Sequence, residues 1–294
     1  MVPSMDLKQL YWNMICEFNT RRQVKQLKHE IKQNKPIILI HQPGRVGSMT
    51  IRKTTESLGL PSAIYHTHFI NPETNKKQHE FYNEHLGKVN QRHMRIAKVL
   101  GEAILSGRYQ GTLKVIVTVR DPLRRELSNF MLDVEKYYRK NFFTDYSNGA
   151  ISINEVQELF LNSRRELTRD NWFDDDVKTP FNIDIFTQEF DHNKKYNIYR
   201  NGNVELLLFR LEDISEVIQT AFKDYFGIEP KQIVSRHLSG SRSMEDLCYR
   251  EISDKLKFNT DFLDQIYQTD YARFFYSNDE RADFCQSWGK VQEA

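Results

Sequence analysis

The sequence predicts an α/β fold, a three-layer sandwich in which helices cover both faces of a central parallel β-sheet. Three observations lead to this prediction. Apolar runs short enough for buried strands recur at 37–41, 63–65, 113–119 and 204–209, and segments with helical spacing separate them. Strands that alternate with helices favour a parallel sheet with right-handed connections. No repeat or linker divides the 294 residues, so a single domain is expected over 1–294.

Composition excludes several classes of protein. Charged residues are 28% and hydrophobic residues 39% of the chain, and the net charge of +2 gives no bulk basic field for nucleic acid. The three cysteines lie far apart, with no metal or disulfide spacing. No stretch approaches the ~18 apolar residues that span a bilayer, and the start of the chain does not read as a signal peptide. We therefore expect a cytoplasmic protein with no nucleic-acid partner and no transmembrane segment.

Residues 1–35 are expected to form a helical extension. Apolar side chains recur at helical spacing over 6–33, and the second half of this stretch is basic. One interpretation is a helix for a membrane surface or a partner. The other is an amphipathic helix packed on the domain with its basic face in solvent, which is the commoner arrangement. We favour the second, so peripheral membrane contact through this helix is not expected.

The core of the site is predicted over 36–130 and begins with a strand, a glycine-bearing loop and a helix start. The strand 37–41 runs into Pro43-Gly44, and a helix is expected over 48–58. Free backbone N–H groups and the helix dipole at such a junction favour an anion. A Walker A loop ends in Gly-Lys-Ser/Thr, but Gly47 is followed directly by Ser48. The predicted anion-binding residues are Gly44, Arg45, Val46, Gly47, Ser48, Met49 and Thr50.

A second anion-binding element follows the strand 113–119. Arg120 stands at the end of this strand, where ligands bind in open α/β sheets. Asp121 and Pro122 can start a helix that continues through residue 137. Ser128 comes eight residues after Arg120, on that helix. An arginine and a serine can clamp a phosphate, although Arg120-Asp121 could instead be a structural salt bridge.

These two elements together resemble the sulfotransferases that use 3′-phosphoadenosine 5′-phosphosulfate (PAPS). Arg45-Val46-Gly47-Ser48 is similar to their 5′-phosphosulfate loop, and Arg120-Asp121-Pro122 with Ser128 is similar to their 3′-phosphate element. The resemblance implies a P-loop NTPase-like fold, PAPS as co-substrate, EC 2.8.2-type activity and no metal. The junction 206–214 also looks like the family. Arg45 stands where well-studied members have lysine, and arginine binds phosphate but is a poor proton donor.

A second resemblance supplies a base. Tyr65-His66-Thr67-His68 looks like the Tyr-His-x-His of the carbohydrate 2-O-sulfotransferases, whose second histidine is the base. Alternation puts both histidines on one face of the strand end, and an imidazole suits proton transfer near neutral pH. We favour His68 over His66. The alternatives are structural histidines and a metal pair, the latter disfavoured because no carboxylate or cysteine stands near them.

The remaining segments carry weaker expectations. Residues 73–84 read as an exposed loop, 89–105 as a helix, and 131–200 as a helical acceptor-side insertion. Residues 201–294 are expected to hold the last strand and the C-terminal helices, among them 244–256 and 260–275. The loop 235–243 could close over the nucleotide through Arg236 and Arg242, or be a solvated turn. Trp172, Phe173 and Tyr138 could line an acceptor cleft.

The Gly-Arg-Val-Gly-Ser form of the loop, with Asn171-Trp172-Phe173 downstream, is similar to bacterial proteins labelled as capsular polysaccharide synthesis proteins. The favoured function is transfer of a sulfuryl group from PAPS to a hydroxyl, on a carbohydrate or another small metabolite. Two alternatives remain: a P-loop-type phosphotransferase, and a non-catalytic nucleotide-binding protein of polysaccharide assembly. The acid run 174–176 is expected to start a helix rather than to bind a metal.

Overall fold

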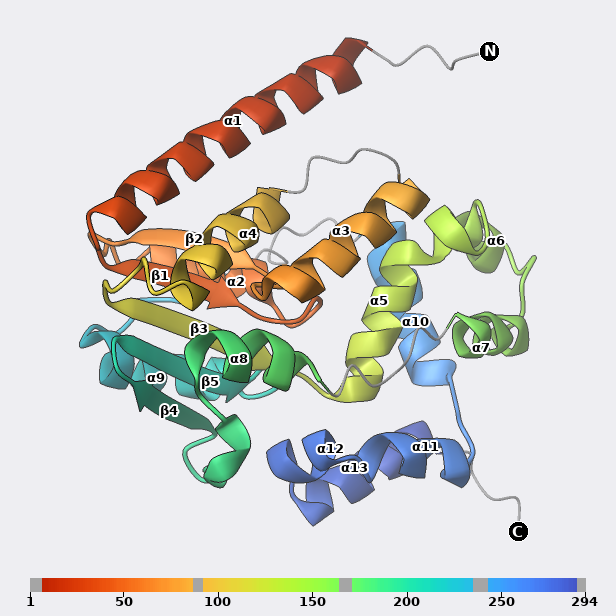
Figure 1. The fold of residues 1–294 in the computed structure, drawn as a ribbon. Helices are drawn as coiled ribbons and strands as arrows, with labels where there is room; N and C mark the ends of the chain where they lie inside the picture. The colour runs from red at the N-terminus through yellow and green to blue at the C-terminus, as the bar shows by residue number, and fades with distance from the viewer. Residues whose placement is uncertain (1–6, 87–91, 164–170, 235–242, 290–294) are drawn as a thin grey trace.

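A computed structural model describes residues 7–86, 92–163, 171–234 and 243–289 (Figure 1). A five-stranded sheet in the order β2-β1-β3-β5-β4 forms its centre. The pairs β1–β2, β1–β3 and β3–β5 are parallel, and β4 pairs with β5 in the antiparallel sense. The strands are β1 (Ile37–His41), β2 (Ala63–Thr67), β3 (Leu113–Val119), β4 (Tyr196–Asn201) and β5 (Val204–Arg210).

Helices surround this sheet and extend beyond its end (Figure 1). The first five are α1 (Leu7–Lys32), α2 (Ser48–Glu56), α3 (Pro72–Leu86), α4 (Arg92–Leu105) and α5 (Pro122–Tyr137). The middle of the chain adds α6 (Phe142–Ser147), α7 (Ile153–Asn162), a π-helical turn η1 (Asp174–Lys178), α8 (Thr179–Phe181) and a 3₁₀ turn η2 (Ile185–Thr187). The remainder are α9 (Ile214–Phe226), α10 (Met244–Lys255), α11 (Thr260–Tyr267), α12 (Asp270–Phe275) and α13 (Asn278–Trp288).

The predicted sandwich of helices around a central sheet is confirmed, and the sheet is mostly parallel. Strand β3 has the predicted bounds, and every one of its side chains but Lys114 is buried. Helix α5 starts where expected because the Asp121 carboxylate accepts hydrogen bonds from the backbone N–H groups of Leu123 and Arg124, with Pro122 at the first turn. These signals are local, which is why the sequence alone could place them.

Three expectations about secondary structure were wrong. Residues 73–84 form most of helix α3 rather than a loop. The expected insertion 131–200 includes the start of β4, which forms an antiparallel hairpin with β5 through Asn201-Gly202-Asn203. An Asn-Gly pair between two strands is a hairpin signal. The expected helix 260–275 is split, because the Thr269 side chain accepts from Ala272 N and caps α12.

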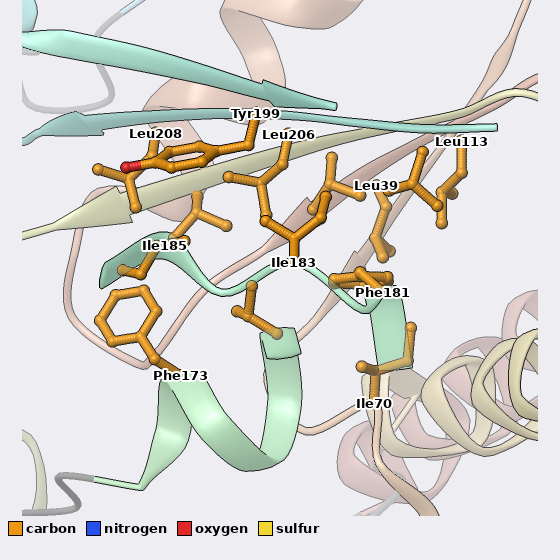
Figure 2. Packing of buried hydrophobic residues seen from close by; sticks show 14 of the residues in the cluster. Leu39, Ile70, Leu113, Phe173, Phe181, Ile183, Ile185, Tyr199, Leu206 and Leu208 are labelled. Atoms are coloured by element: carbon orange, nitrogen blue, oxygen red, sulfur yellow. The ribbon is translucent and has the colours of Figure 1, made fainter. Parts of the chain in front are cut away.

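Two hydrophobic clusters cover the two faces of the sheet. One face packs against α1, α4 and the segment 172–190. Figure 2 shows Phe173, Phe181, Ile183 and Ile185 of that segment pointing at sheet residues such as Leu208. The other face packs against α2 and α9. Full burial of such aliphatic side chains stabilises the fold by roughly 1.5–3 kcal/mol each.

A third cluster lies beyond the sheet and is made of helices and the segments that connect them. It joins α5, α6 and α7 to α10, α11 and α13 (Figure 1). Aromatic rings dominate it: Phe142, Phe160 and Phe258 are almost fully buried. Helices from the expected insertion and from the expected C-terminal part therefore share one core. This core holds α5 against the carboxyl end of β3, where Arg120 stands.

Candidate functional site

The loop between β1 and α2 has the backbone shape of an anion-binding turn. Arg45 and Gly47 adopt left-handed conformations, with φ of 69° and 81°. No side chain caps the N-terminus of α2, which begins after Gly47. Among the described residues, the N–H groups of residues 44–49 donate to no backbone carbonyl. The loop therefore presents free donors and a helix N-terminus in one place.

Gly47 is required by this geometry. A Cβ atom at this position would come within 2.6 Å of Leu211 Cδ1, and the positive φ would strain any other residue. Arg45 has no such freedom and still adopts a left-handed φ. Strain of this kind costs of order 1–3 kcal/mol and persists where the surrounding structure imposes it. At Arg45 the strained backbone aims a guanidinium group at helix α5.

The structure brings the two predicted anion-binding elements together. Arg45 Nε donates to Ser128 Oγ at 2.9 Å, across 83 residues of sequence. One guanidinium nitrogen of Arg120 donates to the Arg45 carbonyl oxygen at 3.1 Å, and the other donates to Tyr249 Oη at 3.0 Å. All of these partners are neutral. Partial desolvation, and then the nearby Arg120 charge, lower the pKa of Arg45 from its ordinary value. Two cations thus lie close together, and among the described residues no carboxylate forms an ion pair with either guanidinium group.

Several buried groups fix the turn that carries Arg120. Tyr271 Oη donates to the Arg120 carbonyl at 2.8 Å. The Asp121 N–H donates to Glu212 at 2.8 Å, and Tyr267 Oη donates to the Asp121 carboxylate at 2.9 Å. Burial raises the pKa of both the Asp121 and the Glu212 carboxyl groups. Asp121 therefore shapes the turn and does not neutralise Arg120, and its own ion pair is with Arg124, at 3.5 Å. The alternative of an Arg120-Asp121 salt bridge is not what the structure contains.

Both predicted histidines lie at the end of β2, and a third joins them. The ring centroids of His66 and His68 are 4.5 Å apart, and those of His68 and His93 are 5.0 Å apart. His66 and His68 therefore share one face of the strand end, as predicted. His93 comes from α4 and was not predicted, because nothing in a single helical histidine points to a distant strand. We call His66, His68 and His93 the histidine row.

The hydrogen bond of His68 sets its tautomer. Its Nδ1 lies 2.7 Å from the Gln42 carbonyl oxygen. A carbonyl can only accept, so Nδ1 carries the proton and the Nε2 lone pair is available in the neutral ring. Gln42 comes directly before the Pro43-Gly44 turn, so this bond links the histidine row to the loop. Trp172 Nε1 donates to the His68 carbonyl at 2.8 Å and fixes the backbone on the other side.

Burial keeps the whole histidine row neutral at physiological pH. It lowers the pKa of His68, lowers that of His66 well below its ordinary value, and brings that of His93 to about 3. The neighbouring rings add to this effect for His66 and His93, since a second charge would repel the first. The three rings of the row are therefore neutral at rest.

A fourth histidine, also missed from the sequence, has a structural role. His41 ends β1 and is fully buried, with Nδ1 2.8 Å from Thr67 Oγ1 and Nε2 2.8 Å from the Asp176 carbonyl oxygen. Both ring nitrogens are used, so none is left for a ligand. The Asp176 carboxylate accepts from Asn71 N at 2.9 Å, and burial raises its pKa to about 7. The turn η1 therefore ties the ends of β1 and β2 together, and the acid run starts a helical turn as expected.

A cleft of about 860 Å³ opens next to Pro43, and its lining in the described chain includes neither Arg45 nor Arg120 nor a histidine of the row. Pro43 and Pro122, which follow β1 and β3, form part of its wall, together with Trp172 and Phe173. Phe186 is 40% exposed and offers an aromatic surface to this cleft. Trp172 and Phe173 thus line a cleft, and both also belong to the buried core of the sheet. Tyr138 instead packs in the third cluster, where its hydroxyl donates to the Ser163 carbonyl at 3.2 Å.

The other predicted residues take different places. Val46 is buried under the loop, Met49 is 39% exposed, and Thr50 begins the hydrogen-bonding of α2 by donating its N–H to Gly47 O at 3.0 Å. Gly44 has space around it and only ordinary contacts. Arg236 and Arg242 lie outside the described residues. Gln42, which was not predicted, is fully buried with neither side-chain polar atom hydrogen-bonded within the described chain.

Two searches of the described residues gave negative findings. No group of three or more His, Cys, Asp or Glu side chains there has the arrangement to hold a metal ion. No helix in the same ranges combines the length and apolar character needed to cross a membrane.

Comparison with known proteins gives one match. A family described as "Putative capsular polysaccharide synthesis protein" matches residues 147–277, a little under half of the chain. No curated protein and no solved structure matches significantly. The matched region begins after the loop, Arg120 and the histidine row, but it contains residues that hold them: Trp172 beside His68, Glu212 beside Asp121, and Tyr249 and Tyr271 beside Arg120. The chain is thus similar to this family in the region that supports the candidate site.

Proposed function

We propose that this protein is a sulfotransferase that moves a sulfuryl group from PAPS to a hydroxyl of a carbohydrate acceptor. The proposal includes a fold of the P-loop-like sulfotransferase type, and it places the enzyme in the cytoplasm, where PAPS would be its soluble co-substrate.

One observation carries the proposal: the convergence of Arg45, Arg120 and Ser128 at the free N-terminus of α2. Their hydrogen-bond partners in the described chain are neutral, so the loop brings positive charge and hydrogen-bond donors together without an ion pair to an acid there. A ligand with two separate phosphate-type groups suits this arrangement, because arginine recognises such oxygens through paired donors. PAPS carries a 5′-phosphosulfate and a 3′-phosphate. Residues 44–50 would hold the first, and Arg120 with Ser128 the second.

The histidine row supports a role in proton transfer. In the proposed reaction the acceptor oxygen attacks sulfur, and an O–S bond forms as the bond from sulfur to the 5′-phosphate oxygen breaks. The hydroxyl proton passes to Nε2 of His68, whose other nitrogen is held by Gln42 O. The products are the sulfated acceptor and 3′-phosphoadenosine 5′-phosphate (PAP). Arg45 would stabilise the charge on the leaving phosphate without donating a proton.

The acceptor class rests on the cleft and on the family similarity. Aromatic surfaces such as Phe186, with polar groups of Asn171, Gln265 and Gln268 around them, form the kind of wall that packs against sugar rings and bonds their hydroxyls. The description of the matched family names capsular polysaccharide synthesis. A saccharide hydroxyl is therefore the acceptor that we propose.

A thermal-shift comparison tests the nucleotide. We expect PAP without metal to raise the unfolding temperature more than ATP with magnesium does, because ligand that binds only the folded state stabilises it. Stabilisation by magnesium and ATP alone would favour a P-loop-type phosphotransferase and overturn the proposal. Binding of PAP without sulfuryl transfer to any of a panel of capsular oligosaccharides would favour a non-catalytic protein of polysaccharide assembly.

A further inference from the structure

Helix α1 packs on the domain along only one side. Leu27 and Ile31 are buried against the sheet and α4, and Thr20 is 1% exposed. Figure 1 shows the N-terminal end of α1 projecting beyond the sheet and beyond α4. The sequence favoured a helix packed on the domain. The structure shows that such packing accounts for one face of the helix, and that the opposite face is exposed in the part of the chain that the structure describes.

The free face has a regular composition. Tyr11, Met14 and Phe18 are 66%, 70% and 68% exposed, although large apolar side chains of a globular protein are usually covered. Their spacing of three and four residues continues along the same line of the helix, where the side chains become basic. The exposed residues of this line, which we call the α1 stripe, are Tyr11, Met14, Phe18, Arg21, Lys25, Lys28 and Lys32.

The acidic residues of α1 in the described chain point elsewhere. Glu17 pairs with Arg95 of α4 at 2.9 Å and with Arg21 at 2.6 Å. Glu30 is buried and accepts from Tyr65 Oη at 2.6 Å. Only Arg21 in the stripe therefore has a nearby acid on α1, and the outward face keeps a net positive charge. Arg22 and His29 are exposed next to the stripe and add no negative charge.

The charge pattern of the α1 stripe indicates whether a second copy of α1 or a lipid bilayer fits against it. Two copies of α1 side by side would place basic halves against each other in the parallel arrangement, and a basic half against an apolar half in the antiparallel one. Neither arrangement is complementary. An anionic bilayer fits both halves at once, because aromatic and thioether side chains enter the interface while lysine and arginine contact lipid phosphates.

We propose that the α1 stripe binds the surface of an anionic lipid membrane, with α1 lying along the bilayer and the domain on its far side. The stripe faces away from the domain along its whole length, so binding requires no unpacking of α1. The face is too polar in its second half to insert fully, so the contact is peripheral and reversible. This inference does not depend on the proposed transfer reaction.

The test is flotation of the full-length protein with vesicles. Vesicles that contain about 30% phosphatidylglycerol in phosphatidylcholine should carry the protein, and pure phosphatidylcholine vesicles should not. Lys25→Glu with Lys28→Glu and Lys32→Glu should weaken binding at least ~10-fold, since each basic side chain near an anionic surface contributes to the attraction. A matched control reverses three exposed lysines elsewhere: Lys77, Lys140 and Lys231 to Glu. It should leave binding within about twofold, because its net charge change is the same but the α1 stripe is intact.

A second variant tests whether the apolar part of the α1 stripe contributes to vesicle binding in addition to its charge. Tyr11→Ser with Met14→Ser and Phe18→Ser should also reduce binding, and thermal unfolding should verify that each variant is folded. Absence of binding by the wild type to anionic vesicles overturns the proposal. So does equal loss in the control variant, or a dimer that forms through the same three apolar residues without any affinity for vesicles.

Discussion

The loop between β1 and α2 and the histidine row lie at neighbouring strand ends but differ in how they carry charge. Around the loop, Arg45 and Arg120 keep their charges close together with neutral partners. In the histidine row, burial lowers the pKa values and removes charge. Gln42 joins the two regions, since it precedes the loop and accepts from His68. This difference is the basis of the proposed division of labour, in which the loop would bind an anion and His68 would accept a proton.

The strongest test of this division is His68→Gln. Loss of a general base lowers rates by typically 10²–10⁴-fold, and we expect a fall of that size in sulfuryl transfer. PAP affinity should stay within about twofold, because the variant leaves the loop and its arginines in place. Transfer is measured with labelled PAPS and affinity by titration calorimetry. His66→Gln serves as the matched control and should have a smaller effect on transfer.

The converse test is Arg120→Ala. A hydrogen bond to a charged group is worth about 1.5–3 kcal/mol, so PAP affinity should fall by roughly 10- to 150-fold. The change also removes the bonds to the Arg45 carbonyl and to Tyr249, so part of the loss comes from a looser loop. Lys136→Ala, an exposed cation on the same helix as Ser128, provides a control. Unchanged PAP affinity in Arg120→Ala would remove Arg120 from the nucleotide site.

Gly47→Ala is expected to perturb the loop alone. The left-handed backbone disfavours alanine by roughly 1–2 kcal/mol, and Leu211 would have to move from the new methyl group. We expect lower thermal stability and a several-fold weaker PAP affinity, with the histidine row unaffected. Gly149→Ala, at a positive φ with open space around it, is the control for backbone strain without a clash. Equal PAP affinity in wild type and Gly47→Ala would show that the loop tolerates another shape.

The smallest expected effect concerns pH. Burial lowers the pKa of His68 below its usual value near 6.5, so its neutral form persists as the pH falls through 6.5. The kcat/KM for transfer should therefore change by less than about twofold between pH 7.5 and 6.5, and decline only at lower pH. A profile that halves at pH 6.5 would mean that the His68 imidazole titrates as if exposed to water.

The sequence predicted the parts of the site that depend on local chemistry. The Pro43-Gly44 turn, the Asp121 cap and the alternation of His66 and His68 are each set by a few adjacent residues, and the structure contains them. Their assembly depends on tertiary contacts. His93 reaches the row from α4, and Tyr249 reaches Arg120 from α10, across 129 residues of sequence. No local pattern encodes such contacts.

The missed elements have equally specific reasons. Helix α3 reads as polar, and its buried anchor Asn75 bonds the Phe69 and Met94 carbonyls, which a search for apolar periodicity does not detect. Strand β4 lies at the sheet edge, its last two residues, Arg200 and Asn201, are exposed, and its apolar run is short. The Asn201-Gly202 pair was the available signal for that hairpin.

Titration of the wild-type protein with PAP and with adenosine 5′-phosphate tests the central claim most directly. The two ligands differ only in the 3′-phosphate, which Arg120 and Ser128 are proposed to hold. We predict that PAP binds at least ~10-fold more tightly, in proportion to one charged hydrogen-bonded contact, and that Arg120→Ala removes most of this difference. Equal affinity of the wild type for the two ligands would contradict the account.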